Sequence, residues 1–205
     1  MEELIDQNQW SVLLSSKLPG EEAQFKMAPA SRREFKHDGD PLRAAVLFLM
    51  YPSTKGTTLV FIKRNEYNGP HSGQVSLPGG AWEAGDEVIE NTAIRETMEE
   101  LGIDGDIKIL GSLTELLIPV SNYLVSPFVG CLDHRPEFHP DHSEVQYIIE
   151  TPLENLLDPR NKDCEMMVSH GQSLWVPFYH INEEKIWGAT AMMLCEFLQL
   201  ASMLR

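Results

Sequence analysis

Three glutamates occupy the eight-residue segment Arg95–Gly102, whose sequence is RETMEELG. On a helix, Glu96, Glu99 and Glu100 are three and four residues apart, and like charges at those spacings repel each other. Lysine is absent from the segment, so Arg95 is its single cation. Arg95 lies one turn before Glu99, where a planar guanidinium can hold a carboxylate in a fixed orientation. The segment therefore predicts either a solvated acidic helix face or a site that binds a cation.

A glycine-rich stretch, Leu77–Gly80 (LPGG), precedes this segment. Glycine lets the backbone turn sharply and brings a bare carbonyl close to a ligand. Carboxylates and a carbonyl together form an oxygen-only site, which suits Mg²⁺ or Mn²⁺ better than zinc. Such a cation would remove the repulsion between the glutamates, bridge a diphosphate and activate water. A phosphoanhydride hydrolase needs the last two of these effects.

The composition limits the possible partners. The chain has 205 residues, 42% of them apolar, which is enough for one folded unit. Lysine and arginine total 16 against 31 acidic residues, so the formal net charge is −15. This charge argues against nucleic acid or an anionic membrane as the main partner. An anionic substrate would need a local cation.

The first ten residues, MEELIDQNQW, do not resemble an export signal, and no later run approaches eighteen apolar residues. The three cysteines, Cys131, Cys164 and Cys195, are odd in number and far apart. This usage is typical of a reducing compartment and not of a disulfide framework. We therefore expect a cytoplasmic protein.

Hydrophobic periodicity predicts the elements that position these residues. A helix is expected over about residues 2–17, followed by a polar connector over 19–41. Strands are expected at 44–51, 57–64, 107–113, 122–132, 144–150, 163–169 and 173–181, with a turn at Lys55–Gly56. The spacing of Met193, Phe197, Leu200 and Leu204 predicts a closing helix.

This order of elements predicts an α/β fold, an α/β/α sandwich with a mixed β-sheet covered by helices on both faces. We divide the chain into an N-terminal helix and connector, residues 1–41, and a main domain, residues 42–205. The acidic helix is expected at 87–101, with Asp86 as its N-cap and Gly102 ending it. A helical projection places the glutamates opposite an apolar stripe of Ile94, Met98 and Leu101.

The segment GGAWEAGDEVIENTAIRETMEELGI resembles the signature of the Nudix hydrolases. The resemblance implies an α/β/α sandwich, a metal held by glutamates of one helix, and a substrate in which a nucleoside diphosphate is linked to another group. Carried over by position, it implies that Arg95 orients Glu99. It also implies that Glu96, Glu99 and Glu100 hold the metal and that Gly79 offers its carbonyl.

This chain departs from the signature at two places. Six residues separate Gly80 from Glu87 where the family has five, and Thr97 replaces an apolar residue. The extra residue and the upstream stretch FIKRNEYNGPHSGQVSLPGG resemble the branch of coenzyme A diphosphatases. Where many members of that branch have Leu-Arg, this chain has Asn68–Pro70, so one phosphate-binding arginine is missing. The similarity extends from about residue 43 to 204.

Candidate substrate-binding cations lie upstream of the LPGG stretch. Lys63, Arg64 and His71 are the local cations, and coenzyme A carries a 3′-phosphate that such charges would favour. The alternatives are that Lys63 and Arg64 mark an exposed strand end and that His71 and Gln74 fix a turn.

A further carboxylate is expected to reach the site from a loop. Glu144 is the candidate, as a catalytic residue, and Glu115 and Asp141 compete with it. A zinc site remains as an alternative reading of one loop, with the spacing Cys-x2-His-x4-His-x2-His over Cys131, His134, His139 and His142. Prolines interrupt that loop, and zinc ligands are usually paired more tightly, which disfavours the zinc site.

We therefore expect a Mg²⁺- or Mn²⁺-dependent diphosphatase that cleaves coenzyme A or acyl-coenzyme A to 3′,5′-ADP and (acyl-)4′-phosphopantetheine. Water would attack phosphorus while a glutamate accepts the proton. One alternative is a Nudix hydrolase of ADP-ribose or another nucleoside diphosphate derivative. Another is a non-catalytic nucleotide-binding domain with a regulatory role. The partner would be a small molecule, with neither nucleic acid nor membrane, and a homodimer is possible.

Overall fold

The fold is built on one large mixed β-sheet, in a computed structural model that describes residues 5–29, 32, 39–69, 71–169 and 172–204. Within those residues the sheet has eight strands. Its main path runs in the order β3-β2-β1-β7-β5, with β4 paired to β1, β6 to β7 and β8 to β2. The strands are β1 (Leu42–Ser53), β2 (Gly56–Arg64), β3 (Val75–Ser76), β4 (Gly79–Ala81), β5 (Lys108–Ser112), β6 (Leu116–Ile118), β7 (Tyr123–Cys131) and β8 (Val145–Pro152).

Strand β1 lies at the centre of this sheet. It runs parallel to β7 and antiparallel to β2 and β4. Most of its side chains are buried, as expected for a central strand that is covered on both faces. Successive residues alternate between two cores, so Leu47 and Leu49 pack under one face and Phe48 and Met50 under the other.

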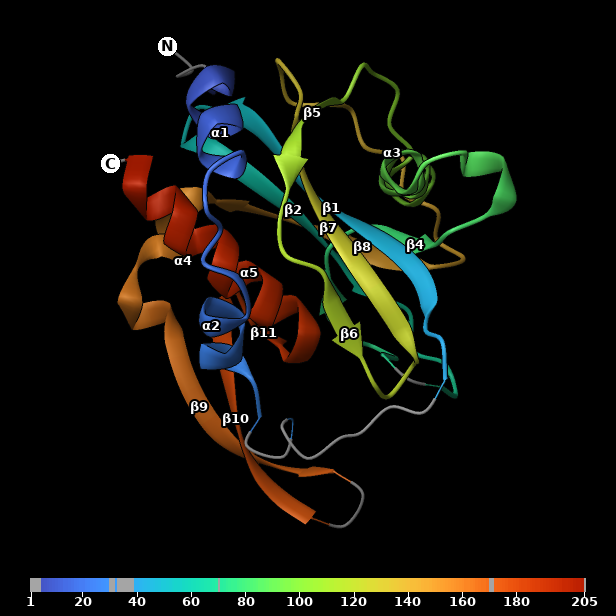
Figure 1. Cartoon of the computed structure of the whole chain (residues 1–205), viewed down its shortest axis with the longest axis vertical. Coiled ribbons are helices and arrows are strands. Elements are labelled where there is room, and N and C mark those ends of the chain that lie inside the picture. The colour runs from blue at the N-terminus through green and yellow to red at the C-terminus, as the bar shows by residue number, and fades with distance from the viewer. Residues whose placement is uncertain (1–4, 30–31, 33–38, 70, 170–171, 205) are drawn as a thin grey trace.

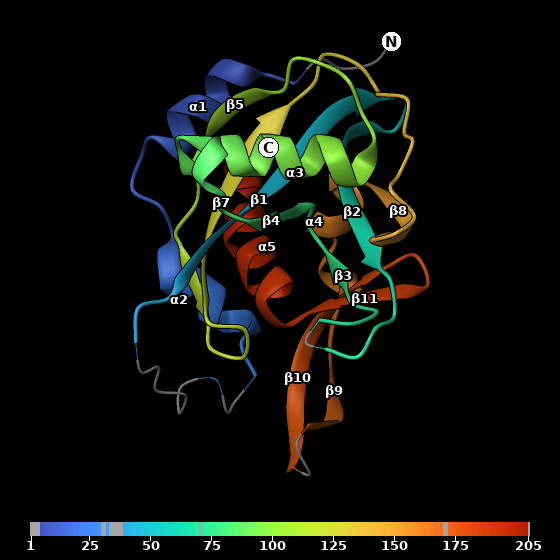
Figure 2. The ribbon, with the colours of Figure 1, turned by 90° about the vertical axis from the view of Figure 1, so that its right-hand side faces the viewer.

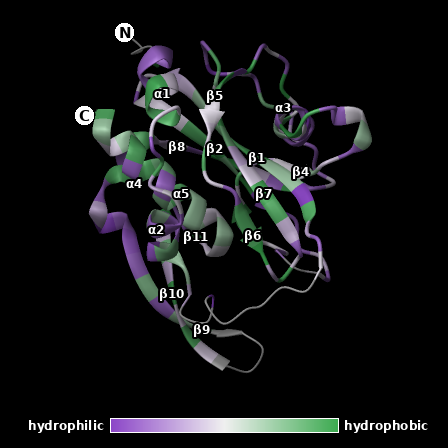
Figure 3. Ribbon diagram, viewed as in Figure 1, coloured by the Kyte–Doolittle hydropathy of each residue, from purple (hydrophilic) through white to green (hydrophobic). Residues whose placement is uncertain are grey.

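Helices cover both faces, which confirms the predicted sandwich (Figure 1). Helix α3 (Ile89–Leu101) covers one face, and α1 (Gln7–Leu14), α2 (Gly20–Gln24) and α5 (Gly188–Ala201) cover the other. Hydrophobic residues follow the central strands and α5, whereas α3 is largely hydrophilic (Figure 3). None of the helices in the described residues is long and apolar enough to cross a membrane.

A second, three-stranded sheet projects from the body of the molecule (Figure 2). Its strands are β9 (Lys162–Ser169), β10 (Gln172–Ile181) and β11 (Glu184–Trp187), in the order β11-β10-β9. A short helix, α4 (Leu153–Leu157), leads into it from β8. The sequence predicts β9 and β10 but not α4 or the strands β3, β4, β6 and β11, because these span too few residues to show a period.

The N-terminal residues pack against the closing helix. Trp10 of α1 stacks on Phe197 of α5, with ring centroids 5.0 Å apart, and Phe197 stacks on Phe48 of β1 at 4.6 Å. The buried carboxylate of Glu196 accepts hydrogen bonds from the Gly20 amide and the Gln24 side chain. These contacts make the described part of residues 1–41 a layer of the core on the α5 side.

Helix α1 is shorter than the predicted span of residues 2–17. It begins at Gln7, where the Asp6 carboxylate caps the Gln9 amide at 3.0 Å. It ends at Leu14, and the hydroxyl of Ser15 then donates back to the Ser11 carbonyl. Residues 1–4 lie outside the described part of the chain.

Helix α3 differs from its prediction at the first turn and on its buried face. It begins at Ile89 after Val88, which makes no side-chain cap, so the prediction of Asp86 as N-cap is wrong. Gly102 ends the helix in the left-handed region (φ 56°), as predicted, where a Cβ would lie 1.7 Å from the carbonyl oxygen of His139. The buried residues are Thr92, Ala93, Thr97, Glu100 and Leu101, whereas Ile94 and Met98 are only partly buried.

Candidate functional site

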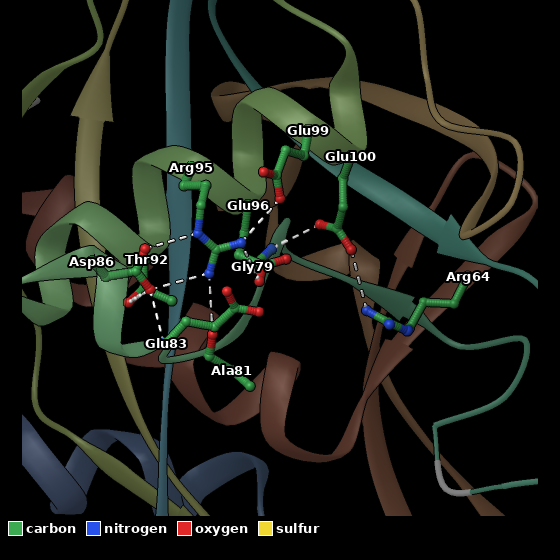
Figure 4. Close-up of polar contacts among 10 residues, drawn as sticks. All are labelled: Arg64, Gly79, Ala81, Glu83, Asp86, Thr92, Arg95, Glu96, Glu99 and Glu100. Carbon is green, nitrogen blue, oxygen red and sulfur yellow. Dashed lines mark hydrogen bonds and ion pairs between the residues drawn. The ribbon is translucent and has the colours of Figure 1, made fainter.

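An ion pair between the buried Asp86 and the partly exposed Arg95 anchors the site (Figure 4). Asp86 is 5% exposed and ends the short turn Ala84–Asp86. The Nε of Arg95 donates to one Asp86 oxygen at 2.8 Å and its Nη2 donates to the other at 3.1 Å. The Thr92 hydroxyl and the Glu83 amide add two further donors to the same carboxylate. The hydrogen bonds from Arg95, foremost among these contacts, hold the pKa of Asp86 well below its usual range.

The other end of the Arg95 guanidinium holds two glutamates. Its Nη1 lies 2.9 Å from Glu96 Oε1 and 3.0 Å from Glu99 Oε2. Hydrogen bonds to Asp86, and then to these glutamates, raise the pKa of Arg95 against the effect of its burial. Burial of Glu96 raises the pKa of that carboxyl. Arg95 therefore offsets part of the repulsion between the glutamates of α3.

Glu100 occupies a different environment from the other two glutamates. Its side chain is 3% exposed, whereas that of Glu99 is 61% exposed, so the expectation of one shared surface is wrong. The Gly79 amide donates to Glu100 Oε2 at 2.8 Å, and Arg64 Nη1 lies 3.5 Å from Oε1. Burial raises the pKa of Glu100 to about 7, although both contacts oppose the shift.

The glycines of the LPGG stretch allow the backbone to approach the helix. Gly79 has a φ of 146°, and a Cβ there would lie 2.2 Å from the Ala45 carbonyl oxygen of the central strand. A Cβ on Gly80 would lie 2.5 Å from the carboxylate carbon of Glu96. The absence of a side chain at Gly79 therefore lets β4 pair closely with β1, and its absence at Gly80 makes room for the Glu96 carboxylate. The expected contact of the Gly79 carbonyl with a metal stays a prediction.

The donor set fits a hard divalent cation. Glu96, Glu99 and Glu100 present only carboxylate oxygens, and their hydrogen-bond partners among the described residues include no cysteine or histidine. In the described part of the chain, no three acidic, histidine or cysteine side chains converge as a ready-made ligand set. The glutamates contact Arg95, Arg64 and the Gly79 amide instead. Binding a cation would require the carboxylates to exchange some of these partners.

An open cavity of about 550 Å³ lies beside the end of β2. It is lined by Arg64, Asn65, Glu66, Tyr67, Ser143 and Glu144. Arg64 belongs to both the cavity and the glutamate cluster, because its guanidinium reaches Glu100. Arg64 therefore connects this cavity to the acidic helix.

Glu144 enters this cavity from the loop before β8. The Asn65 amide donates to the Glu144 carbonyl at 3.0 Å, which ties the loop to the end of β2. The negative charge of Glu144 is close enough to contribute to the raised pKa of both Glu96 and Glu100. Its two competitors have other partners, since Asp141 accepts from the Ser143 amide and Glu115 from the Ser126 hydroxyl.

The three candidate cations are placed differently. Arg64 lies beside Glu100, but the ammonium of Lys63 lies 2.8 Å from Glu184 of β11. The ring of His71 contacts the Gln74 side chain at 3.3 Å, and His71 itself has a φ of 65°. The latter geometry matches the alternative in which His71 and Gln74 fix a turn. Of the three side chains, Arg64 is the one that lines the cavity.

The residues of the alternative zinc reading have separate partners. Cys131 is fully buried in the core on the α5 side, and burial raises the pKa of its thiol. His139 lies near Glu137, and His142 lies near the Val145 carbonyl. Cys131 is therefore a core residue, and His139 and His142 are loop residues with partners of their own.

Asp86 was expected from sequence to be the N-cap of the acidic helix, but it is the carboxylate that holds Arg95. The resemblance to the signature directs attention to Glu87, but Glu87 is exposed and has a φ of 58°. The additional residue in the loop shifts the carboxylate that meets Arg95 back by one position, to Asp86. The signal was present in the sequence as an aspartate at the position where the five-residue spacing from Gly80 would end.

Comparisons with known proteins agree with this geometry. The sequence model of the NUDIX domain matches residues 41–197. The Nudix hydrolase NudL of Photorhabdus laumondii is 32% identical over 177 residues, which cover 86% of this chain and 92% of that protein. The chloroplastic Nudix hydrolase 22 of Arabidopsis thaliana is 33% identical over 178 residues, 83% of this chain but 57% of that longer protein.

Solved structures show the same fold at low sequence identity. The Nudix hydrolase RenU from M. smegmatis superposes with a TM-score of 0.57 at 14% identity, covering 82% of this chain and 90% of that one. A MutT/nudix family protein from Enterococcus faecalis gives a TM-score of 0.53 at 13% identity, covering 98% and 76% of the two chains. With the domain match and the relatives above, these findings establish that the chain belongs to the Nudix hydrolases, enzymes that act on phosphoanhydride bonds.

Proposed function

We propose that this protein is a Mg²⁺- or Mn²⁺-dependent diphosphatase that cleaves coenzyme A or acyl-coenzyme A to 3′,5′-ADP and (acyl-)4′-phosphopantetheine. The observation that carries the proposal is the position of Arg64, which lines the cavity and reaches Glu100 of the acidic helix. A guanidinium there can bind a phosphate while the scissile bond lies beside the carboxylates. The upstream stretch FIKRNEYNGPHSGQVSLPGG supports coenzyme A as the substrate, through its resemblance to the coenzyme A diphosphatases.

Each residue of the cluster has a proposed task. Glu96, Glu99 and Glu100 would hold the cation, which when bound supplies charge neutralisation of the diphosphate and activation of water. Arg95 keeps Glu96 and Glu99 oriented, because Asp86 fixes the guanidinium from behind. The raised pKa of Glu100 reflects a buried carboxylate that a cation would keep ionised.

Glu144 is the residue that we assign to accept the proton. A water oxygen forms the new bond to phosphorus, and the bridging oxygen leaves with the electron pair of the broken bond. The water proton passes to a carboxylate, and Glu144 presents one in the cavity, outside the Arg95 cluster. Arg64 would stabilise the charge that develops on the phosphoryl oxygens.

ADP-ribose or another nucleoside diphosphate derivative is the second candidate substrate. Among the side chains that line the cavity, Arg64 is one cation against the two carboxylates of Glu66 and Glu144. Lys63 is paired with Glu184. This charge balance favours a substrate without the additional 3′-phosphate of coenzyme A.

A product assay separates the candidates. The purified protein is incubated with coenzyme A, dephospho-coenzyme A, ADP-ribose and NADH, with Mg²⁺ or Mn²⁺, and the products are identified by mass. Coenzyme A should give 3′,5′-ADP with the highest kcat/KM. A higher kcat/KM for ADP-ribose would replace coenzyme A with the second candidate. Binding without turnover of any substrate would favour the regulatory, non-catalytic alternative, and chromatography at several concentrations would test the proposed homodimer.

A further inference from the structure

Two neighbouring residues at the end of β2 lie on opposite faces of the large sheet. Phe61 packs in the core on the α5 side and Ile62 in the core under α3, so the alternation places Lys63 and Arg64 on those two faces in turn. Their partners agree, because Arg64 reaches Glu100 of α3 and Lys63 reaches Glu184 of the second sheet. The Lys63 ion pair therefore ties the projecting sheet to the strand that carries Arg64.

A tyrosine completes this contact. Tyr147 of β8 lies directly opposite Lys63 in the β2–β8 ladder, and its hydroxyl donates to Glu184. The side chains of Lys63 and Glu184 are 18% and 25% exposed, so solvent screens this pair less than a fully exposed one. Burial opposes ionisation of Glu184, but the donors Lys63 and Tyr147 outweigh it and hold the pKa of the carboxyl below its usual value. The same contact raises the pKa of Tyr147 to about 12.

The ladder between β2 and β8 is irregular at the same point. Lys63 is opposite Tyr147 but Arg64 is opposite Val145, which leaves Gln146 as an additional residue in β8. An irregularity of this kind bends the strands and changes the direction of the neighbouring side chain. The bend therefore lies between the residue held by Glu184 and the residue that lines the cavity.

Within the described residues, the guanidinium of Arg64 is held by its contact with Glu100. Its contact with Glu100 is 3.5 Å long, at the upper limit for a hydrogen bond, and its side chain is 26% exposed. Fixing such a flexible side chain on a ligand costs rotamer entropy, so the direction in which β2 presents Arg64 affects how readily it binds.

We propose that Glu184 and Tyr147 are positioning residues of the active site. By holding Lys63 on one side of the bend, they direct Arg64 on the other side toward a phosphate of a nucleoside diphosphate bound in the cavity. The choice of ligand rests on the proposed function. The proposal gives Lys63 the role of an anchor in place of the substrate contact expected from sequence.

A double-mutant cycle tests the connection with ADP as the probe. Calorimetric titration with ADP and Mg²⁺ gives Kd for the wild type, Glu184→Gln, Arg64→Ala and the double variant. Arg64→Ala should weaken ADP binding about ten- to hundredfold, the range for a lost charge-assisted hydrogen bond. Glu184→Gln should weaken it about three- to tenfold in the wild type and by less than about twofold in the Arg64→Ala background.

Three further variants distinguish a positioning role from a general loss of structure. The variant that combines Lys63→Glu with Glu184→Lys restores the ion pair with its charges exchanged, so it should recover at least half, on a logarithmic scale, of the ADP affinity that Glu184→Gln loses. Tyr147→Phe should weaken ADP binding less than Glu184→Gln does. Glu165→Gln is the matched control, because Glu165 forms its ion pair with Lys185 of the second sheet and not with a residue of β2. It should leave Kd for ADP unchanged.

The outcomes are distinct. The positioning role would be overturned if Glu184→Gln weakened ADP binding equally in both backgrounds, or if the charge exchange failed to recover affinity. It would also be overturned if Glu165→Gln weakened ADP binding as much as Glu184→Gln does, or if the wild type did not bind ADP. Thermal unfolding of every variant identifies any that has lost its fold, and the remaining variants then decide. Hydrolysis is measured separately, so ADP binding with a coupled cycle but no turnover of any diphosphate would reject the proposed function and keep this inference.

Discussion

Arg95 meets Asp86 through two hydrogen bonds, 2.8 and 3.1 Å long, and Asp86, not Glu87, is the residue that follows Gly80 at the five-residue spacing of the signature. Glu87 is exposed and adopts a φ of 58°, between the turn Ala84–Asp86 and the start of α3 at Ile89. The buried Asp86 thus fixes one edge of the guanidinium, and the other edge holds Glu96 and Glu99. This relationship links the loop length to the geometry of the acidic helix.

The first prediction contrasts Asp86 with Glu87. Asp86→Asn should lower the free energy of unfolding by about 1.5–3 kcal/mol, because hydrogen bonds to the Arg95 cation weaken in a buried place. It should also lower turnover at least about tenfold, since Glu96 and Glu99 lose their fixed partner. Glu87→Gln should change neither quantity appreciably. Urea unfolding measures the stability and steady-state kinetics measure the turnover. A larger effect of Glu87→Gln than of Asp86→Asn would contradict the role given to Asp86.

The second prediction concerns pH. The folded-state pKa of Asp86 lies below its unfolded value of about 3.9, so its contribution to stability is complete above that value and is lost as the pH falls. The difference in unfolding free energy between the wild type and Asp86→Asn should therefore stay constant from about pH 7 to 5 and shrink below about pH 4. Urea titrations at several pH values test the sign. A difference that grows on acidification would contradict the ion pair.

The long elements could be predicted from sequence because their periods extend over many residues. The buried runs in β1, β2 and β7 and the αL glycine after α3 are all local signals. The short strand β4 is not local in this sense. It exists because Gly79 and Gly80 lie against β1 and Glu96, and only tertiary contacts reveal that need.

The site divides in the same way. The identity of the glutamates and of Arg95 followed from their types and spacing, but the burial of Glu100 did not, because a helical projection treats all three carboxylates as one polar face. Whether Lys63 or Arg64 faces the site depends on which face of β2 each occupies. The alternation along β2 assigns the two residues to opposite faces, but which face lies under α3 is known only from the tertiary packing of Phe61 and Ile62.

The third prediction concerns Thr97, which stands where the family has an apolar residue. Its side chain is fully buried, and its hydroxyl has no hydrogen-bond partner within the described residues. Thr97→Val keeps the shape and removes the unpaired group, so the free energy of unfolding should rise by about 1 kcal/mol. Thr92→Val is the matched control on the same helix, because that equally buried hydroxyl donates to Asp86. It should be destabilising, and a similar sign for both variants would argue against the explanation.

The fourth prediction concerns the metal. Chelation should abolish hydrolysis and added Mg²⁺ or Mn²⁺ should restore it, because the proposed chemistry requires a divalent cation. Glu99→Gln keeps the size and helix propensity of the side chain but removes a charge, so turnover should fall about a hundredfold while the fold is retained. Glu90→Gln, in the first turn of the same helix, is the control and should keep its turnover. Full activity in excess chelator would reject the metal-dependent mechanism.

The last prediction concerns the N-terminal layer, whose role the sequence left open. Trp10 is 3% exposed and stacks on Phe197, which in turn stacks on Phe48 of the central strand. Trp10→Ala should therefore lower the free energy of unfolding by about 3–5 kcal/mol, the cost of removing a large aromatic side chain from a packed core. Val12→Ala on the same helix is the control, because Val12 is 71% exposed, and it should cost less than about 0.5 kcal/mol. Turnover per folded molecule should stay close to the wild-type value in both variants, since the stack lies under the face of the sheet opposite α3. Urea unfolding gives the stabilities, and equal small losses for the two variants would show that the helix is an appendage and no part of the core.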